Sequence, residues 1–295
     1  MYKIGIDLGG TKIEGIVLDA NLNEIFRKRI STEQELGYDH ILNQISELYS
    51  SLVKEIKSTH HTFGIGTPGS ISSKTGLLKN SNTVCMNGKP FLSDLENILK
   101  RKIAIENDAN CFAMAEAIMG AGKGYDMVFG VIMGTGCGGG IVFKEQLIKG
   151  PQSIAGEWGH STIAPKDGPL CYCGKRGCVE TLISGGGLQK RYVEQTRNSK
   201  SLQEIIDLYR SGDQQCVTLM NDFFENFGIA LSNIINILDP DVVVMGGGVS
   251  NIEELYTLGI KEVYKNIFND MPTTRIVKNK AGDSAGVWGA ALIGI

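Results

Sequence analysis

The sequence has no long hydrophobic run, no excess of basic charge and no N-terminal signal pattern. No apolar stretch approaches the roughly 20 residues that a bilayer-spanning helix needs. The formal net charge is −3, whereas a nucleic-acid-binding surface would carry a basic stripe. The N-terminus, MYKIGIDLGG, places an aspartate and glycines soon after a single lysine, which is not the pattern of a signal peptide. We therefore expect a cytoplasmic protein that binds neither membranes nor nucleic acid.

The sequence also lacks the cysteine pattern of an exported disulfide framework, because its seven cysteines are an odd number without an export signal. Three of them, Cys171, Cys173 and Cys178, crowd together, and His160 lies shortly before them. One imidazole and three thiols are the ligand set of a closed tetrahedral Zn²⁺ site. The alternative is three free cysteines and an unrelated histidine, in a chain with only four histidines. Because four protein ligands leave no open position, we predict a structural zinc.

Glycine, in contrast, is abundant, and the 38 glycines form clusters instead of a linker. The clusters follow apolar runs at residues 9–10, 134–140, 185–187 and 246–248. Glycines at strand ends allow the backbone to approach a ligand closely. The P-loop pattern G-x-x-x-x-G-K-[ST] is absent, so the chain is not a P-loop enzyme.

The first glycine turn, DLGGTK, comprises Asp7, Gly9, Gly10, Thr11 and Lys12 besides a leucine. Exposed backbone N–H groups in such a turn bind anions. Thr11 can donate to a phosphoryl oxygen, Lys12 can offset its charge, and Asp7 can hold Mg²⁺ directly or through water. A plain hairpin turn is the alternative, but glycine alone would suffice for that.

The second glycine turn, GTGCGG at 134–139, formally matches the dinucleotide-binding pattern G-x-G-x-x-G. That reading requires a following helix, whereas the next residues, GIVF, are typical of a strand. We therefore predict a hairpin turn for a second phosphate and reject a nicotinamide-dependent oxidoreductase. A third glycine cluster, at 246–248, follows the apolar strand at 242–245. It either lies against a nucleotide or forms a buried turn. The nucleotide-binding candidates in these two runs are Gly134, Thr135, Gly136, Cys137, Gly246, Gly247 and Gly248.

Segments with strand and helix periodicity are interspersed, which predicts an α/β fold. Strands are expected at 3–7, 13–18, 24–30, 62–66, 102–106, 127–133, 140–143 and 242–245, and helices at 40–56, 109–119, 214–238 and 285–292. The segments IGIDLGGTKIEGIVL and GVIMGTGCGGGIVF are similar to each other. This favours two similar lobes with phosphate turns facing a common cleft, although any two hairpins share such a pattern.

Asn107 and Asp108, in the segment IENDANCFAMAEA, lie where a predicted strand gives way to a helix. Phosphoryl transfer needs positioning, a metal and a carboxylate that accepts the hydroxyl proton, and Asp108 suits that role. The alternative, which these residues alone favour, is a helix N-cap. Glu157 and Glu180 flank the predicted zinc ligands. They are either surface charges or acceptors held rigid for sugar hydroxyls.

The whole chain resembles the ROK family of bacterial sugar kinases and related repressors. The resemblance is carried by DLGGTK, NDANCFAMAEA, GTGCGGG, GEWGH, CYCGKRGC with the following ET, DPDVVVMGGG and GDSAGVWGAA, in that order. It implies an α/β, two-lobed, actin-like (ribonuclease H-like) fold, with lobes at 1–119 and 120–283 and a C-terminal helix at about 284–295 that returns to the first lobe. It also implies transfer of the ATP γ-phosphate to a hexose hydroxyl, and a homodimer.

The resemblance also assigns roles to residues. Asp108 becomes the general base, whether or not it also caps the helix, and the turns at 7–12, 134–137 and 246–248 hold ATP. Cys137, beside a phosphate turn, is either sensitive to oxidation or a buried, inert thiol. His160 is both a zinc ligand and a sugar ligand. The residues implied to bind or shape the sugar site are Gly69, Asn80, Asn82, Asn107, Asp108, Glu157, His160 and Glu180.

Within the family, residues 66–91 and GEWGH resemble the fructokinase and mannokinase branch most. We therefore expect D-fructose to be phosphorylated at its 6-hydroxyl, with mannose as a second substrate. An N-acetylglucosamine kinase or a glucokinase of the same family is the alternative. Two alternatives come from another class. A repressor of this family needs a helix-turn-helix, which we do not expect because the first strand begins at residue 3. A non-catalytic sugar sensor would have lost the acid at position 108 or the phosphate turns, whereas all of them are present.

Overall fold

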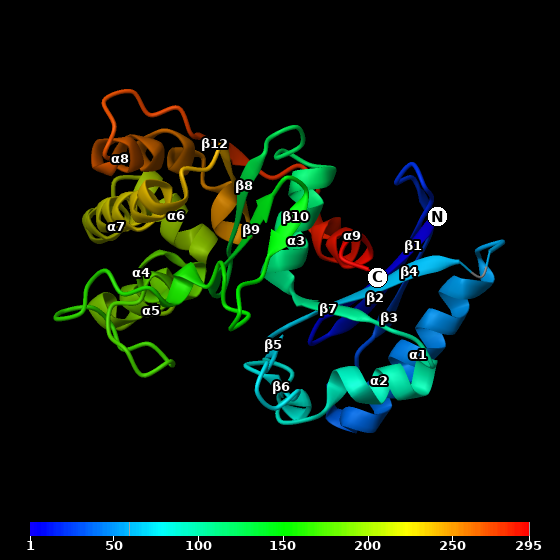
Figure 1. The fold of residues 1–295 in the computed structure, drawn as a ribbon. Helices are drawn as coiled ribbons and strands as arrows, with labels where there is room; N and C mark the ends of the chain where they lie inside the picture. Colours follow the sequence, from blue (N-terminus) through cyan, green and yellow to red (C-terminus); the bar gives the residue numbers. More distant parts are fainter. Residues whose placement is uncertain (59, 295) are drawn as a thin grey trace. The chain divides into compact units, whose positions relative to one another are not determined.

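The computed structural model describes residues 1–58 and 60–294, so the last residue of the expected C-terminal helix lies outside the described part. The chain forms two α/β units and contains two five-stranded mixed sheets (Figure 1). The first unit consists of the described residues within Met1–Gly120, Gly140–Ala155 and Ala281–Ile295, and the second of Ala121–Gly139 and Gly156–Lys280. The lobes proposed from the sequence differ from these units mainly because the segment 140–155 groups with the first unit.

The first sheet has the order β3-β2-β1-β4-β7. Its strands are β1 (Tyr2–Leu8), β2 (Lys12–Leu18), β3 (Glu24–Ser31), β4 (His61–Thr67) and β7 (Ala104–Asn107). The first three form the predicted antiparallel meander, and β4 and β7 continue the sheet in parallel with β1. A short hairpin, β5 (Ser70–Ile71) and β6 (Leu78–Lys79), lies between β4 and β7 in the sequence.

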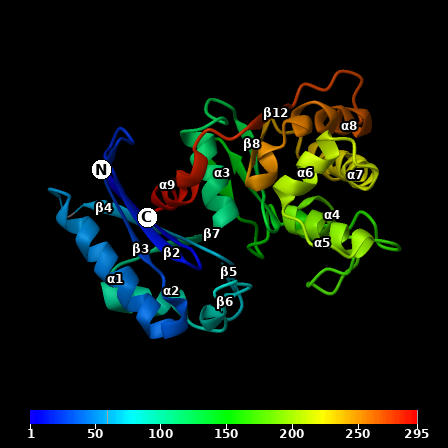
Figure 2. The same cartoon turned by 180° about the vertical axis from the view of Figure 1, so that it is seen from behind.

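The helices of the first unit cover both faces of its sheet (Figures 1 and 2). They are α1 (Tyr38–Lys54), α2 (Phe91–Leu99), α3 (Asp108–Ile118) and α9 (Ala285–Leu292). The predicted apolar stripe of α1, including Ile41 and Leu48, is buried in the main core together with α2. On the other face, Val287 of α9 packs with Ile16 of β2, and α9 also contacts β1, β4 and α3. Each such fully buried aliphatic side chain contributes roughly 1.5–3 kcal/mol.

The second sheet has the order β10-β9-β8-β11-β12. Its strands are β8 (Met127–Met133), β9 (Cys137–Phe143), β10 (Gln146–Ile148), β11 (Val242–Gly246) and β12 (Arg275–Lys278). The strands β8, β11 and β12 are parallel. All residues of β11 are buried, as expected for a central strand of a parallel sheet.

The second unit also contains α4 (Val179–Ile183), α5 (Gly185–Thr196), α6 (Leu202–Arg210), α7 (Gln214–Leu238) and α8 (Leu258–Asn266). The predicted long helix agrees with α7 residue for residue. One expectation was wrong: the glycines at 185–187 follow a helix and begin α5, so they do not end a strand. After β11 the glycines lead only into short 3₁₀ helices, Gly248–Asn251 and Glu253–Tyr256. None of the helices in the described part of the chain has the length and hydrophobicity that a membrane-spanning segment requires.

Candidate active site and metal cluster

The candidate residues of the first unit gather at the carboxyl edge of three parallel strands. In the register of the sheet, Asp7 lies opposite Gly66, and Thr67 lies opposite Asn107. Because the carboxyl ends of β1, β4 and β7 meet at one edge, Asp7 and the residue that follows β7, Asp108, lie at the same edge of the sheet. This is the edge where α/β proteins bind ligands.

The helix cap at this edge is Asn107 and not Asp108. The side-chain oxygen of Asn107 accepts a hydrogen bond of 2.7 Å from the backbone N–H of Asn110. Asp108 is the first residue of α3, and its Oδ1 accepts from the N–H of Ala109 at 2.9 Å. Although the Asp108 side chain reaches solvent, desolvation by the surrounding protein raises the pKa of its carboxyl, and the Ala109 N–H acts in the opposite direction. The N-cap alternative for Asp108 is therefore wrong, and its carboxylate is available for other chemistry.

Asp7 has an unusually basic carboxyl group. Burial, reinforced by the negative charges of Asp108 and Glu14 and opposed by Lys12, raises the pKa of Asp7 to about 6. The backbone of α9 approaches this carboxylate closely, since a Cβ at Gly286 would lie 2.6 Å from its Oδ2. A nearby cation would favour the ionised form of such a carboxyl group, which is consistent with the expected Mg²⁺ role.

The turn that follows Asp7 is shaped by hydrogen bonds to its backbone. The N–H of Gly9 donates to the carbonyl of Lys12 at 2.9 Å. Thr32, at the end of β3, donates its hydroxyl to the Gly9 carbonyl at 2.7 Å and its N–H to the Thr11 carbonyl at 3.1 Å. The side chains of Thr11 and Lys12 remain exposed. Sequence reasoning missed Thr32, which no motif marks.

Three further residues that the resemblance assigned to the sugar site lie in the segment between β4 and β7. Gly69 and Asn80 both have left-handed backbone conformations, with φ values of 84° and 60°. The side chains of Asn80 and Asn82 are exposed beside the β5–β6 hairpin. Their assignment to the sugar pocket remains a proposal.

The candidate residues of the second unit gather at the carboxyl edge of β8 and β11. Gly246 lies opposite Ile132 in this parallel pair, so the turn at 134–137 and the glycines at 246–248 come to the same edge. The first turn is closed by a hydrogen bond of 2.9 Å from the Gly134 N–H to the Gly136 carbonyl. The residues after it form the strand β9, as predicted, which removes the dinucleotide-binding interpretation.

Cys137 and Glu180 meet at this turn. The backbone N–H of Cys137 donates to Oε2 of Glu180 at 3.0 Å. Burial and the adjacent Glu180 charge raise the pKa of the Cys137 thiol well above its usual range. A buried thiol of this kind is inert, so the oxidation-sensitive alternative has no support. Sequence reasoning also missed this contact of Glu180.

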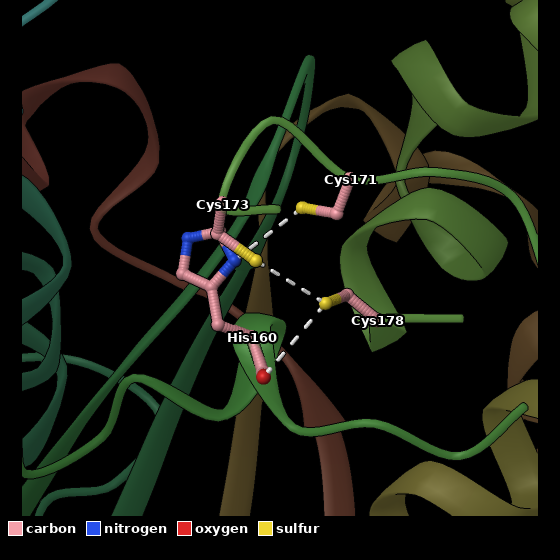
Figure 3. Close-up of side chains that lie close together, drawn as sticks. All are labelled: His160, Cys171, Cys173 and Cys178. Atoms are coloured by element: carbon pink, nitrogen blue, oxygen red, sulfur yellow. Dashed lines mark hydrogen bonds between the residues drawn. The ribbon is translucent and has the colours of Figure 1, made fainter. Parts of the chain in front are cut away.

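The four predicted metal ligands converge in the second unit (Figure 3). One ligand atom from each of His160, Cys171, Cys173 and Cys178 lies within 4.8 Å of the others. The Sγ atoms of Cys173 and Cys178 are 3.6 Å apart, and the Sγ of Cys171 is 3.7 Å from Nδ1 of His160. A tetrahedral zinc with Zn–S bonds of about 2.3 Å separates its sulfurs by about 3.8 Å. The cluster therefore fits a single zinc ion.

The surroundings of the cluster fix its imidazole. Trp158 donates its indole N–H to the Gly138 carbonyl at 3.0 Å, which anchors the short helix that carries His160 on β9. Nε2 of His160 is hydrogen-bonded to the Tyr172 hydroxyl at 2.9 Å, so Nδ1 is the nitrogen that faces the sulfurs. Partial desolvation, with the negative charge of Glu180 as the next cause, raises the pKa of Tyr172 to about 12. The negative charge of Glu180, a predicted sugar ligand, is therefore felt at the Tyr172 hydroxyl.

Comparison with known proteins places these features in a family. The sequence matches the ROK family over residues 3–294. It is 36% identical to an N-acetyl-D-glucosamine kinase from Pasteurella multocida, over 99% of this chain and 98% of that protein. A similar enzyme from Pectobacterium atrosepticum is 35% identical, over 98% of this chain and 97% of that protein. These relatives favour the N-acetylglucosamine alternative and give no support to the expected fructokinase and mannokinase branch.

Two solved structures are similar along their whole length. The ROK hexokinase from Thermus thermophilus has a TM-score of 0.90 and 30% identity, covering 100% of this chain and 98% of that one. A ROK family glucokinase from Streptomyces griseus, in complex with glucose and AMPPNP, has a TM-score of 0.76 and 27% identity, covering 100% of this chain and 99% of that one. The predicted two-lobed, actin-like α/β fold is confirmed. The chain belongs to the ROK family.

Proposed function

We propose that this protein is an ATP-dependent sugar kinase that phosphorylates N-acetyl-D-glucosamine. The observation that supports the proposal is the position of Asp108, whose carboxylate does not cap α3 and lies at the same carboxyl edge of the first sheet as Asp7. The names of the relatives supply the reaction and the sugar.

In the proposed mechanism, Asp108 accepts the proton of the sugar 6-hydroxyl. The sugar oxygen then forms a bond to the γ-phosphorus of ATP while the bond between that phosphorus and the β–γ bridging oxygen breaks, and ADP leaves. The raised pKa of Asp108 makes its carboxylate a better proton acceptor than an ordinary aspartate. Mg²⁺, when bound, would offset the charge of the phosphates.

We assign the nucleotide to the two glycine turns and to the glycines at 246–248. Asp7 would hold Mg²⁺, and Thr11 and Lys12, which are exposed on the first turn, would contact phosphate oxygens. Exposed Thr135 offers a second hydroxyl on the other turn. Backbone N–H groups in such turns bind anions.

We assign sugar recognition to the polar side chains around Asn107 in the first unit and around His160 in the second. Glu157 is exposed next to the short helix that carries His160. A carboxylate can accept two hydroxyl hydrogen bonds, which is the usual way that proteins orient a sugar. Zinc in the cluster would be structural, since its four ligands leave no position for a substrate.

An ADP-coupled assay tests the proposal. N-acetylglucosamine, N-acetylmannosamine, glucose, mannose and fructose are compared as substrates with MgATP. We expect the highest kcat/KM for N-acetylglucosamine, at least about tenfold above fructose, since a site built around one substituent discriminates by that much or more. A preference for fructose would overturn the choice of sugar and restore the motif-based prediction. No ADP formation with any hexose would overturn the kinase assignment. Light scattering tests the proposed homodimer separately.

A further inference from the structure

The glycine turn at 134–137 is held from one side by the helix that follows the metal cluster. Oε2 of Glu180, on α4, accepts the N–H of Cys137 at 3.0 Å. The same oxygen would lie only 2.6 Å from a Cβ at Gly136, so a side chain at that position would displace the carboxylate.

The next helix, α5, contacts the same turn. The N–H of Gly185 donates to the Gly134 carbonyl at 2.8 Å. A Cβ at Gly186 would lie 2.4 Å from the carbonyl oxygen of Thr135, so the two backbones are in direct contact. Ser184 caps α5 by accepting from Gly187 at 2.9 Å, which fixes where the helix begins. The turn therefore rests on α4 and on the first turn of α5.

The metal cluster is attached directly to this support. Cys178 is the N-cap residue of α4, and Glu180 lies two positions later. The carbonyl of Cys178 accepts from the Thr181 hydroxyl at 2.7 Å, and the N–H of Val179 donates to the Ser161 carbonyl at 2.9 Å. A helix of only five residues does not form by itself, so its direction depends on what holds its ends.

We propose that Glu180 is a positioning residue through which the metal cluster orders the nucleotide-binding turn. The cluster fixes Cys178, Cys178 fixes α4, and α4 places the Glu180 carboxylate on the Cys137 N–H. Zinc would thus set nucleotide affinity as well as hold the sugar side of the site. The inference rests on the proposed function, because it takes the turn at 134–137 as a phosphate-binding turn.

The chemistry of the contact gives a sharp expectation for two variants. A carboxylate near bound phosphate repels it, while its hydrogen bond to the turn orders the site for phosphate. Glu180→Gln keeps a hydrogen-bond acceptor and removes the charge, so nucleotide affinity should stay equal to that of the wild type or rise. Glu180→Ala removes both, so the affinity should fall about tenfold. If Glu180 acts only on the sugar, neither variant changes nucleotide affinity.

The test measures MgADP binding by calorimetry without sugar, in the zinc-loaded full-length protein and both variants. Glu194→Gln, which removes an exposed carboxylate from α5, is the matched control and should bind MgADP like the wild type. Amide hydrogen exchange of the Cys137 N–H is measured on the same samples. We expect faster exchange in Glu180→Ala than in the wild type, with exchange in Glu180→Gln remaining near the wild-type rate. Equal exchange and equal affinity in all four proteins would overturn the inference.

Zinc removal completes the test. Chelation of zinc should lower the MgADP affinity of the wild type about tenfold. It should not lower the MgADP affinity of Glu180→Ala further, because zinc removal and the substitution break the same connection between the cluster and the turn. If zinc removal and Glu180→Ala lowered the MgADP affinity additively, the inference would be overturned. If circular dichroism shows that the zinc-free protein unfolds, the exchange data on the zinc-loaded proteins decide. A wild type that binds no nucleotide, but whose Cys137 exchange still depends on Glu180, would refute the proposed function and leave the structural coupling intact.

Discussion

The carboxylate of Glu116 accepts a hydrogen bond of 2.7 Å from the backbone N–H of Ala281. Its other oxygen lies 2.0 Å from the place where a Cβ of Gly120 would be. Glu116 is fully buried on α3, and both of its neighbours lie where the chain leaves or re-enters the first unit. A buried glutamate thus lies against the point where the chain first leaves the first unit and bonds to the point where it finally returns.

Replacing Glu116 by alanine should therefore destabilise the protein. The change leaves the Ala281 N–H without this partner inside the protein, which costs about 1–3 kcal/mol, and adds a cavity. We expect the free energy of unfolding in urea to fall by about 2–3 kcal/mol. Glu47→Ala, on the exposed face of α1, is the control and should change it by less than about 0.5 kcal/mol. If Glu116→Ala lowered the free energy of unfolding as little as the control does, the buried hydrogen bond would contribute nothing to stability.

Much of this fold could be predicted from sequence periodicity. Strands of the meander and the long helix α7 agree with their predictions because their apolar pattern coincides with their buried face. Helix α5 was not predicted, because it begins with three glycines, which are poor helix formers. Helix α6 carried a usable signal, the capping box of Ser201 and Glu204.

The candidate site was predictable where local spacing decides it. The zinc ligands lie close in sequence, so spacing alone predicted the cluster. The contact of Glu180 with the Cys137 N–H depends on how α4 packs against β9, which no local pattern encodes. Sugar preference depends on a few pocket contacts, each worth only a few kcal/mol, and the motif comparison therefore chose another branch than the named relatives favour.

Neutralising Asp7 should stabilise the protein while harming its activity. Burial raises the pKa of Asp7 from 3.8 to about 6, so the folded state binds the proton more tightly than the unfolded state does. Between pH 3.8 and about pH 6 the free energy of unfolding falls as the pH rises. At neutral pH the ionised Asp7 therefore destabilises the folded state by its full amount. Asp7→Asn should raise the free energy of unfolding at about pH 8 by at most about 3 kcal/mol.

This gain should shrink as the pH is lowered from about 6 to about 4, where Asp7 is protonated in the native protein. Asp19→Asn is the control, because the pKa of Asp19 is shifted in the opposite direction. The Asn23 side chain donates a hydrogen bond to Asp19 and lowers its pKa. That variant should bring no gain at about pH 8. Thermal unfolding of the zinc-loaded proteins without Mg²⁺ across this pH range provides the measurement. A gain for Asp7→Asn that is independent of pH would contradict the account.

The metal cluster should hold one zinc per chain. Metal analysis of the purified protein is expected to return one equivalent, and Cys178→Ser should retain much less and unfold at a lower temperature, since structural zinc contributes directly to folding. Cys85→Ser changes a cysteine outside the cluster and should keep the full equivalent. Zinc-free wild-type protein with unchanged thermal stability would remove the structural role.

The proposed kinase reaction depends most on Asp108. In Asp108→Asn, the rate of ADP formation with N-acetylglucosamine should fall at least about a hundredfold, because positioned general bases contribute roughly 10²–10⁴ in rate. Asp39→Asn, which also changes an aspartate in the first turn of a helix, is the control and should keep the wild-type rate.

The most direct test combines this rate with calorimetric binding of the sugar to the same Asp108→Asn protein. We predict that the sugar still binds, with an affinity within about tenfold of the wild type, while phosphoryl transfer is nearly lost. Turnover equal to the wild type would show that the proton goes to another group and that Asp108 is not the general base.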